Sequence, residues 1–139
     1  MTDDLFRFST ALEVRWRDVD ALGHVNNAVY FNYLEQARLY YMRGLGFILQ
    51  DPTQVGFVIA EARCNFKSPL RLGERVMIHA RISELRQSSF DFEYQISGGD
   101  GRLAALAQTV QVCYDYTDQR SGPIPDVWRE AFIAYEPGL

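Results

Sequence analysis

The stretch that decides the fold covers residues 20–38 and reads Asp20-Ala21-Leu22-Gly23-His24-Val25-Asn26-Asn27-Ala28-Val29-Tyr30-Phe31-Asn32-Tyr33-Leu34-Glu35-Gln36-Ala37-Arg38. A carboxylate precedes a turn that contains glycine, and two asparagines then mark the start of a helix. Apolar side chains follow at helical spacing, in Tyr30, Tyr33, Leu34, Ala37 and Tyr41. The pattern predicts a helix from Asn27 to about Gly44, and further apolar residues off this stripe indicate a central helix.

Long strands are predicted before and after this helix. A first strand is predicted at Leu12–Arg17, and the hydrophobic period changes to two after Val55. Further strands are predicted over residues 56–66, 75–85, 88–96 and 102–115, with a hairpin turn at 97–101 and a short helix at about 125–135. Strands of roughly nine to fourteen residues must twist and curl. The expected fold class is therefore α+β, with a long curved antiparallel sheet wrapped around a central helix.

The composition is that of an ordinary globular protein and argues against several function classes. With 139 residues, one domain spanning residues 1–139 is expected. The net charge of −4 and the lack of a basic tract argue against nucleic-acid binding. No apolar run approaches the roughly 18 residues of a membrane span, and the acidic start has no apolar leader. Because Cys64 and Cys113 suggest free thiols, a cytoplasmic protein is expected.

Asp20 is the leading candidate for catalysis. It lies seven positions before Asn27, which is too far for an ordinary N-cap, whereas capping remains the default role of the Asn26 or Asn27 side chain. The free N–H groups of a helix start, at the positive end of the helix dipole, can hold an oxyanion. A carboxylate beside such a site is the minimum equipment for acyl transfer. Asp18 is expected on the same strand face, as a structural partner of a neighbouring arginine.

The motif resembles that of a known family. It is similar to the hotdog-fold acyl-CoA thioesterases of the 4-hydroxybenzoyl-CoA thioesterase class, and most similar to the bacterial long-chain fatty acyl-CoA thioesterases. The match is carried by Asp20-x-x-x-His24-Val25-Asn26-Asn27-Ala28-x-Tyr30 followed by Leu34-Glu35-x-Ala37-Arg38. Residues 66–74 and 87–90 resemble later segments of the same family, in the same order.

The resemblance implies a hotdog fold and a role for each residue of the motif. Asp20 matches the family's catalytic carboxylate, acting as a general base or a nucleophile, and Gly23 matches a turn glycine beside the substrate. The backbone N–H of Asn27, with that of Asn26 as a second donor, matches the group that polarises the thioester carbonyl. The resemblance also implies a homodimer with active sites at the subunit interface, often paired into a homotetramer. Aromatic residues replace the two asparagines in the aryl-CoA branch, which argues against an aromatic acid here.

The remaining candidates have structural as well as functional interpretations. His24 is expected to order the turn or line the substrate pocket, and Tyr30 to line an acyl pocket or the core. With two histidines and no third ligand in view, neither a metal nor a cofactor is expected. Glu35 is the second candidate for the catalytic carboxylate, and its plainer interpretation is an ion pair with Arg38. Polar residues at strand ends are candidates for binding the phosphates of CoA, or are simply solvated: Lys67, Arg71, Arg86, Ser88 and Ser89.

The function expected from these residues is hydrolysis of a fatty or related acyl-CoA to the free acid and CoA. One alternative is an acyl-carrier-protein thioesterase, which would favour a basic surface near the mouth of the pocket. Another is a non-catalytic acyl-CoA binding protein, which has no need of a carboxylate beside an oxyanion site. The acyl chain length and the choice between homodimer and homotetramer are left open by the sequence.

Overall fold

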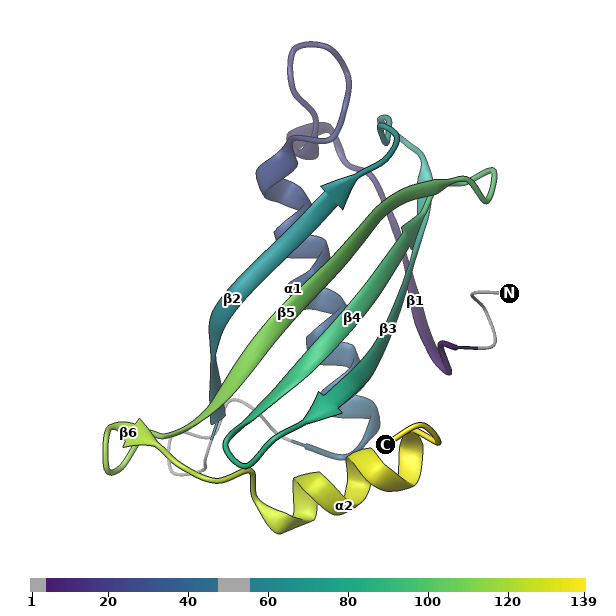
Figure 1. Cartoon of the computed structure of the whole chain (residues 1–139). Helices are drawn as coiled ribbons and strands as arrows, with labels where there is room; N and C mark the ends of the chain where they lie inside the picture. Colours follow the sequence, from purple (N-terminus) through teal and green to yellow (C-terminus); the bar gives the residue numbers. More distant parts are fainter. Residues whose placement is uncertain (1–4, 48–55) are drawn as a thin grey trace.

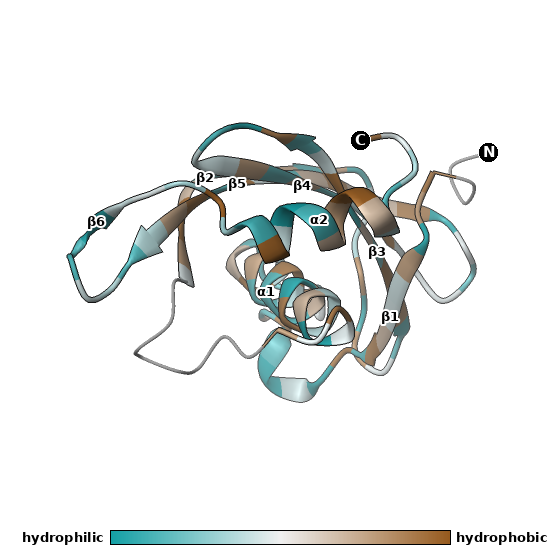
Figure 2. Ribbon diagram, turned by 90° about the horizontal axis from the view of Figure 1, so that it is seen from below, coloured by the Kyte–Doolittle hydropathy of each residue, from teal (hydrophilic) through white to brown (hydrophobic). Residues whose placement is uncertain are grey.

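The computed structural model describes residues 5–47 and 56–139. Its elements follow in the order β1 (Phe8–Glu13), a 3₁₀ helix (Trp16–Asp18), α1 (Asn27–Gly44), β2 (Gly56–Phe66), β3 (Arg75–Leu85), β4 (Ser89–Ser97), β5 (Leu103–Asp115), β6 (Arg120–Ser121) and α2 (Asp126–Tyr135). The long strands form one antiparallel sheet in the order β1-β3-β4-β5-β2, and β6 pairs with β5. The sheet crosses α1 diagonally (Figure 1) and curls around it (Figure 2). The predicted α+β fold, a curved sheet around a central helix, is thereby confirmed.

The core lies between α1 and the concave face of the sheet. Alternation along β3 and β4 sends every second side chain inward, and these residues are at most 1% exposed: Val76, Ile78, Ala80, Ile82, Phe90, Phe92, Tyr94 and Ile96. The helix contributes the stripe predicted from its spacing, and all its members are buried: Tyr30, Tyr33, Leu34, Ala37 and Tyr41. Each large apolar side chain buried in this way contributes about 1.5–3 kcal/mol to folding, which explains why the helix is held in the curve of the sheet.

One end of this core is closed by α2, which buries Trp128 and Phe132. The chain then places the carboxylate of Glu136, which is 3% exposed, between α1 and β3. Its Oε2 accepts hydrogen bonds from the Tyr41 hydroxyl at 2.6 Å and from the Ile82 N–H at 3.0 Å. Burial, and the Glu136 carboxylate beside it, raise the pKa of Tyr41. The end of α2 is therefore tied to both layers of the fold.

The predicted position of the first strand is wrong. β1 spans Phe8–Glu13 and pairs with β3 along its length, so it begins earlier and ends earlier than predicted. After it, the N–H of Asp18 donates to the carbonyl of Arg15 at 2.9 Å, and the Asp18 carboxylate accepts from the Arg15 N–H at 3.0 Å. These bonds close a 3₁₀ turn in which Trp16 is 79% exposed. Trp16, which was predicted to lie in the first strand, is therefore not a core residue. The other predicted elements agree with the structure to within one residue at each end, while β6 had no predicted counterpart.

β2 is a long strand at the edge of the sheet. It pairs with β5 on one side only, and most of its residues are exposed. The exposed residues include apolar ones, since Val58 and Ile59 are each 41% exposed and Phe66 is 43% exposed. An unpaired edge of this length with apolar side chains is a template for pairing with another strand.

Both cysteines are free thiols, as predicted. Cys113 is buried and Cys64 is half-buried, and burial raises the pKa of each thiol to about 11. Neither helix in the described parts of the chain has the length and apolar character needed to cross a membrane.

Candidate active site

The loop before α1 folds around the Asp20 carboxylate. The N–H of Asp20 donates to the carbonyl of His24 at 2.8 Å, and the N–H of Gly23 donates to the carbonyl of Asp20 at 3.0 Å. Gly23 has φ +80°, a conformation that L side chains rarely adopt, which accounts for glycine at this position. Oδ1 of Asp20 accepts from the N–H groups of Leu22 at 2.9 Å and His24 at 3.3 Å. The carboxylate is therefore oriented by backbone donors, and Oδ2 has no donor within residues 5–47 and 56–139.

Asp18 and Asp20 do not share a strand face, contrary to expectation. The Asp18 carboxylate accepts from the Tyr33 hydroxyl at 2.8 Å as well as from the Arg15 N–H. Asp18 therefore anchors the 3₁₀ turn to α1, which confirms a structural role. The group of Arg15 that it binds is the backbone N–H and not the guanidinium. Burial and the Asp18 carboxylate raise the pKa of Tyr33.

The start of α1 presents a free backbone donor. Oδ1 of Asn26 accepts from the N–H of Ala28 at 2.9 Å, so Asn26 is the N-cap. Its own N–H donates to the carbonyl of Asp18 at 2.9 Å and is therefore occupied. The N–H of Asn27, the first residue of α1, meets no acceptor in the described part of the chain. It lies at the positive end of the helix dipole, where a developing negative charge is stabilised.

A cavity of about 280 Å³ brings most of the predicted catalytic residues together. Its wall comes from the loop, the first turn of α1 and the segment after β2: Asp20, His24, Val25, Asn27, Tyr30, Phe66, Lys67, Ser68 and Pro69. The Tyr30 ring meets the Phe66 ring edge-on, with 4.9 Å between centroids, and burial raises the pKa of Tyr30. Four of the lining residues were not predicted from the sequence: Val25, Phe66, Ser68 and Pro69. The motif at residues 66–74 was a signal for the last three.

The backbone of His24 closes the turn by accepting from the Asp20 N–H and donating to Asp20 Oδ1, and His24 also lines the cavity. Its predicted role in the substrate pocket stays a prediction. His24 and Arg71 form an isolated antiparallel bridge, and Nη1 of Arg71 lies 3.2 Å from Nε2 of His24. Because a guanidinium only donates, we assign Nε2 as the acceptor and place the imidazole proton on Nδ1. Within the described residues, no three His, Cys, Asp or Glu side chains are grouped as a metal site.

Basic side chains surround the loop despite the negative net charge. Lys67 lines the cavity with Asp20, and Arg17 lines a hollow of about 490 Å³ with Asp20 and Gly23. Arg71 contacts His24. All three basic residues are exposed, and none takes part in an ion pair with a carboxylate in the described regions. The mouth of the site is therefore locally positive, which suits a phosphorylated ligand.

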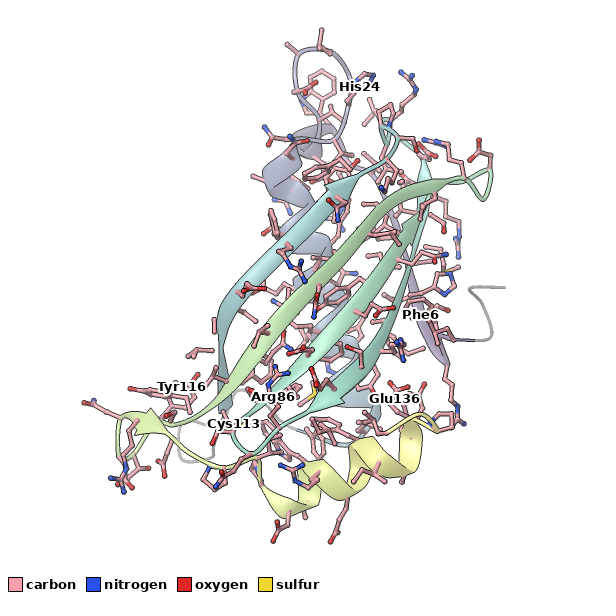
Figure 3. All side chains as sticks on the ribbon, viewed as in Figure 1. Phe6, His24, Arg86, Cys113, Tyr116 and Glu136 are labelled. Atoms are coloured by element: carbon pink, nitrogen blue, oxygen red, sulfur yellow. The ribbon has the colours of Figure 1, made fainter. Side chains whose placement is uncertain are left out.

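Arg86, Ser88 and Ser89 lie at the turn between β3 and β4, at the opposite end of the sheet from His24 (Figure 3). Arg86 pairs with Asp91 and with Glu84, and its Nε donates to Oγ of Ser89 at 2.8 Å. The hydrogen bond with Asp91 raises the pKa of Arg86. Within one chain these residues do not line the Asp20 cavity, and the charge of Arg86 is already paired with the carboxylates of Glu84 and Asp91. Their predicted role in phosphate binding stays a prediction.

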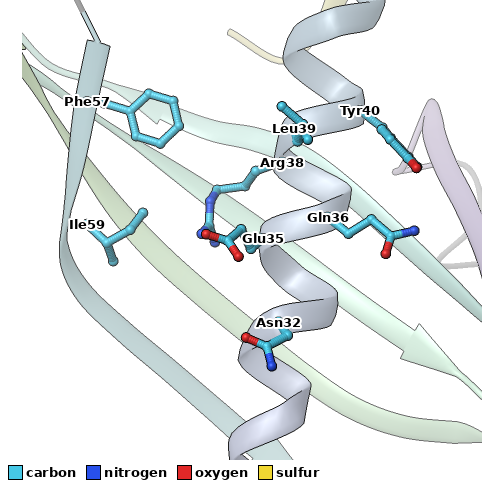
Figure 4. Close-up of a pocket in the computed structure, with 8 residues that line it drawn as sticks. All are labelled: Asn32, Glu35, Gln36, Arg38, Leu39, Tyr40, Phe57 and Ile59. Atoms are coloured by element: carbon cyan, nitrogen blue, oxygen red, sulfur yellow. The ribbon is translucent and has the colours of Figure 1, made fainter. Parts of the chain in front are cut away.

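Glu35 and Arg38 do not form the expected ion pair among the described residues. Nη1 of Arg38 donates instead to the Tyr94 hydroxyl at 3.2 Å, because the side chain reaches toward the sheet. Glu35 is exposed and lines a second cavity, of about 560 Å³, between α1 and β2 (Figure 4). Glu35 and Asp20 therefore line different cavities of one chain.

Comparison with known proteins identifies the family of the chain. A model of the thioesterase-like superfamily matches residues 14–132. The putative acyl-CoA thioesterase YneP of Bacillus subtilis is 28% identical over 131 residues, which cover 90% of this chain and 92% of that protein. The 1,4-dihydroxy-2-naphthoyl-CoA hydrolase of Gloeothece citriformis is 34% identical over 124 residues, covering 82% and 83% respectively. A thioesterase of Thermus thermophilus, solved with coenzyme A and Zn, has a TM-score of 0.86 and 32% identity, covering 96% of this chain and 97% of that chain. The resemblance seen in the sequence is thereby confirmed, and the chain belongs to the thioesterase-like superfamily.

Proposed function

We propose that the protein hydrolyses acyl-CoA thioesters at the cavity before α1, with the Asp20 carboxylate and the Asn27 amide as the working groups. The observation that carries this proposal is that both groups line one cavity, and that each has an atom without a partner among the described residues. A carboxylate oxygen with a free lone pair serves as a base or nucleophile, and a free N–H at a helix start serves as an oxyanion donor.

Two routes follow from this arrangement. In the first, Asp20 takes a proton from a water molecule while the oxygen of that water attacks the thioester carbonyl. The C–S bond then breaks, and CoA leaves as a thiolate that is protonated afterwards. In the second, Oδ2 of Asp20 attacks the carbonyl and expels the CoA thiolate, and water hydrolyses the resulting mixed anhydride. In both, negative charge on the carbonyl oxygen is stabilised by the Asn27 N–H. If a single turnover in H₂¹⁸O places the label in Asp20, the second route operates with water attacking Cγ of the anhydride, because the first route places the label in the acid product.

The locally positive mouth supports CoA as the leaving group. Lys67 and Arg71 are exposed and unpaired with carboxylates in the described residues, so their charge is available to the phosphates of the nucleotide. A CoA complex of a relative with 32% identity agrees with this assignment. The acyl group is a separate question. One relative is named a 1,4-dihydroxy-2-naphthoyl-CoA hydrolase, so aryl substrates belong in the test although Asn26 and Asn27 argue against them.

The first experiment measures thiol release from short, long and aryl acyl-CoAs by the parent protein and by Asp20→Asn. We expect turnover by the parent and loss of at least about a hundredfold in kcat for the variant, with substrate binding largely retained. Asp18→Asn is the matched control, because that carboxylate holds the 3₁₀ turn and does not line the cavity. A variant at Asp20 that kept most of its kcat would remove this residue from the proposed role and direct attention to Glu35.

We further propose a homodimer formed by pairing of the β2 edges. The support is the length of this strand, its unpaired side and its exposed apolar residues. Val58→Lys adds a charge to that edge without removing a core side chain, and light scattering should then report monomers. A Val58→Lys protein with the mass of the parent assembly would place the interface elsewhere.

The acyl-carrier-protein thioesterase is the second candidate function. It is favoured by the exposed basic residues Arg17, Lys67 and Arg71 around the loop, since carrier-protein docking calls for such a surface. The test compares kcat/KM for one acyl group on CoA and on a carrier protein. A preference for the carrier that disappears in Arg17→Glu would support this second candidate.

A further inference from the structure

Three large apolar side chains are exposed on and beside the loop that precedes α1. Trp16 and Leu22 are each 79% exposed, and Leu72 is 49% exposed. Trp16 and Leu72 line one hollow of about 490 Å³. Leu22 lies between Ala21 and Gly23, which line the same hollow. We call these three side chains the apolar tip, and so much apolar surface exposed in one place requires an explanation.

Neither the core nor the family motif explains this exposure. None of the three side chains belongs to the buried cluster between α1 and the sheet. Trp16 precedes the motif at residues 20–38, and Leu22 stands at one of its unspecified positions. The proposed β2 pairing does not cover Trp16 either, because Trp16 follows β1, which is the opposite edge of the sheet.

The apolar tip is bordered by positive charge. Arg17 lines the same hollow, Lys67 lines the adjoining Asp20 cavity, and Arg71 contacts His24 of the loop. As noted above, these three basic side chains are exposed and have no carboxylate partner within residues 5–47 and 56–139. Apolar side chains that include a tryptophan, with basic residues around them, are typical of surfaces that contact anionic lipid.

We propose that the apolar tip docks the protein on a bilayer that contains anionic phospholipid. Trp16 then lies at the level of the headgroups, Leu22 enters the acyl region, and Arg17 attracts lipid phosphates. The loop projects beyond the end of the sheet, at the top of Figure 1. A projecting loop suits a bilayer, because lipids rearrange around it and no complementary shape is needed.

A protein partner fits this surface less well. A stable protein interface buries about 800 Å² on each partner, which is more than three projecting side chains supply. A second copy docked about a two-fold axis brings Arg17 toward the same residue of that copy, and like charges repel. An acidic carrier protein matches the charge of Arg17 and Lys67 but offers no acyl region to Trp16 and Leu22.

Docking at the apolar tip brings the bilayer to the candidate active site. Asp20 lines both the hollow at the tip and the cavity that contains the Asn27 amide. A long-chain acyl-CoA is itself an amphiphile that partitions into bilayers through its acyl chain. The benefit for catalysis rests on the proposed function, whereas lipid binding does not, so the experiment measures binding without turnover.

The experiment records the fluorescence of Trp16 in the presence of vesicles. The chain has two tryptophans, and Trp128 is only 8% exposed, so Trp16→Phe supplies the background emission of Trp128. The vesicles contain phosphatidylglycerol and phosphatidylcholine in equal parts, or phosphatidylcholine alone. We expect the anionic vesicles to shift the Trp16 emission to shorter wavelength and brominated acyl chains to quench it, with little effect of the neutral vesicles.

Two variants test charge and apolar surface separately, by co-sedimentation with the anionic vesicles. Each basic residue near an anionic membrane strengthens binding about fivefold, so Arg17→Glu, which reverses a charge, should weaken it about tenfold or more. Leu22→Ser should also weaken it about tenfold, since a leucine no longer leaves water.

The matched controls make the same changes at the other end of the molecule. Arg120, in β6, has a side chain that is 77% exposed, and Val127, in α2, is 65% exposed. Figure 1 places β6 and α2 at the end of the sheet opposite to the loop. Arg120→Glu and Val127→Ser should therefore bind the vesicles as the parent does.

Several results would overturn the inference. One is the absence of a Trp16 response to either kind of vesicle, and another is vesicle binding that is unchanged in both Arg17→Glu and Leu22→Ser. A Trp16 shift caused by an acidic acyl-carrier protein and not by vesicles would assign the tip to a protein partner. A shift that depends on protein concentration alone would assign it to a second copy. If no CoA ester is cleaved while Trp16 still enters anionic vesicles, the proposed function fails and this inference stands.

Discussion

Replacing Asn27 by proline removes one backbone N–H from the proposed oxyanion site and little else. Proline is well tolerated at the first position of a helix, and the residue before it must be extended, as Asn26 is with φ −62° and ψ 138°. The lost N–H has no acceptor in the described protein, so no internal hydrogen bond is broken. The fold should therefore keep its stability while the reaction loses a donor. Loss of one such donor costs about 2.7–4 kcal/mol in the transition state, which corresponds to a fall in kcat of about 10²–10³.

The assay is thiol release from the best CoA ester, with kcat and KM determined separately. Asn27→Ala is the matched control, because it removes the side chain and keeps the N–H. We expect kcat to fall in Asn27→Pro with KM nearly unchanged, and Asn27→Ala to stay close to the parent, since the donor acts mainly on the transition state. Melting temperatures of the three proteins establish that the helix start is intact. If Asn27→Pro folds like the parent and keeps its kcat, the Asn27 N–H is not the oxyanion donor.

Two further predictions concern the parts that hold the site in place. Glu136→Ala leaves the Tyr41 hydroxyl and the Ile82 N–H buried without an acceptor, which at about 1–3 kcal/mol each should lower the free energy of unfolding by about 2–6 kcal/mol in urea titrations. Glu130→Ala, at an exposed position, is the control. Adding Tyr41→Phe to Glu136→Ala should recover part of the lost free energy of unfolding, and a fully additive loss in the double variant would contradict this account. Glu74 accepts hydrogen bonds from Arg102 and from the N–H groups of Gly99 and Arg71, and these lower its pKa to about 2. Because the folded pKa lies below the unfolded value, its contribution to stability is present above about pH 4.5 and is lost as the pH falls toward 2. Glu74→Gln should therefore be less stable than the parent at pH 6, and the difference should shrink by pH 3; a constant difference would refute this assignment.

The helix and most strands were predictable because their signals are local. The asparagine cap, the helical spacing from Tyr30 to Tyr41 and the glycines after it fix α1 without information from the sheet. Strict alternation in β3 and β4 is likewise a property of the strand itself. The first strand was misplaced because the 3₁₀ turn depends on the Asp18 carboxylate, which bonds to Tyr33 fifteen residues later. No pattern within the strand reveals that contact.

The site was predictable to the same extent. Asp20, Gly23 and Asn27 take their geometry from one loop and the helix that follows it, so the motif contains most of the information. The cavity wall contributed by Phe66 and Pro69 comes from a segment about forty residues away, and only the order of motifs pointed to it. The surroundings of Arg38 were mispredicted because helical spacing offered Glu35, whereas the contact that forms is with Tyr94 on the sheet. Spacing along a helix describes its surface, and Arg38 is directed at the interior.

Two buried ionic groups in this fold are hydrogen-bonded by the protein to different extents. Glu136 is 3% exposed and accepts from two donors on two different elements, so its charge is stabilised by the protein itself. Arg38 is 8% exposed, has the uncharged Tyr94 hydroxyl as its one hydrogen-bond partner among the described residues, and lines a cavity. Removing either charge from water is costly. Among the described residues, the Glu136 carboxylate accepts hydrogen bonds from two elements, whereas the Arg38 guanidinium donates to one hydroxyl. Arg38 also lines the cavity between α1 and β2, where the exposed carboxylate of Glu35 from the same helix is another lining group.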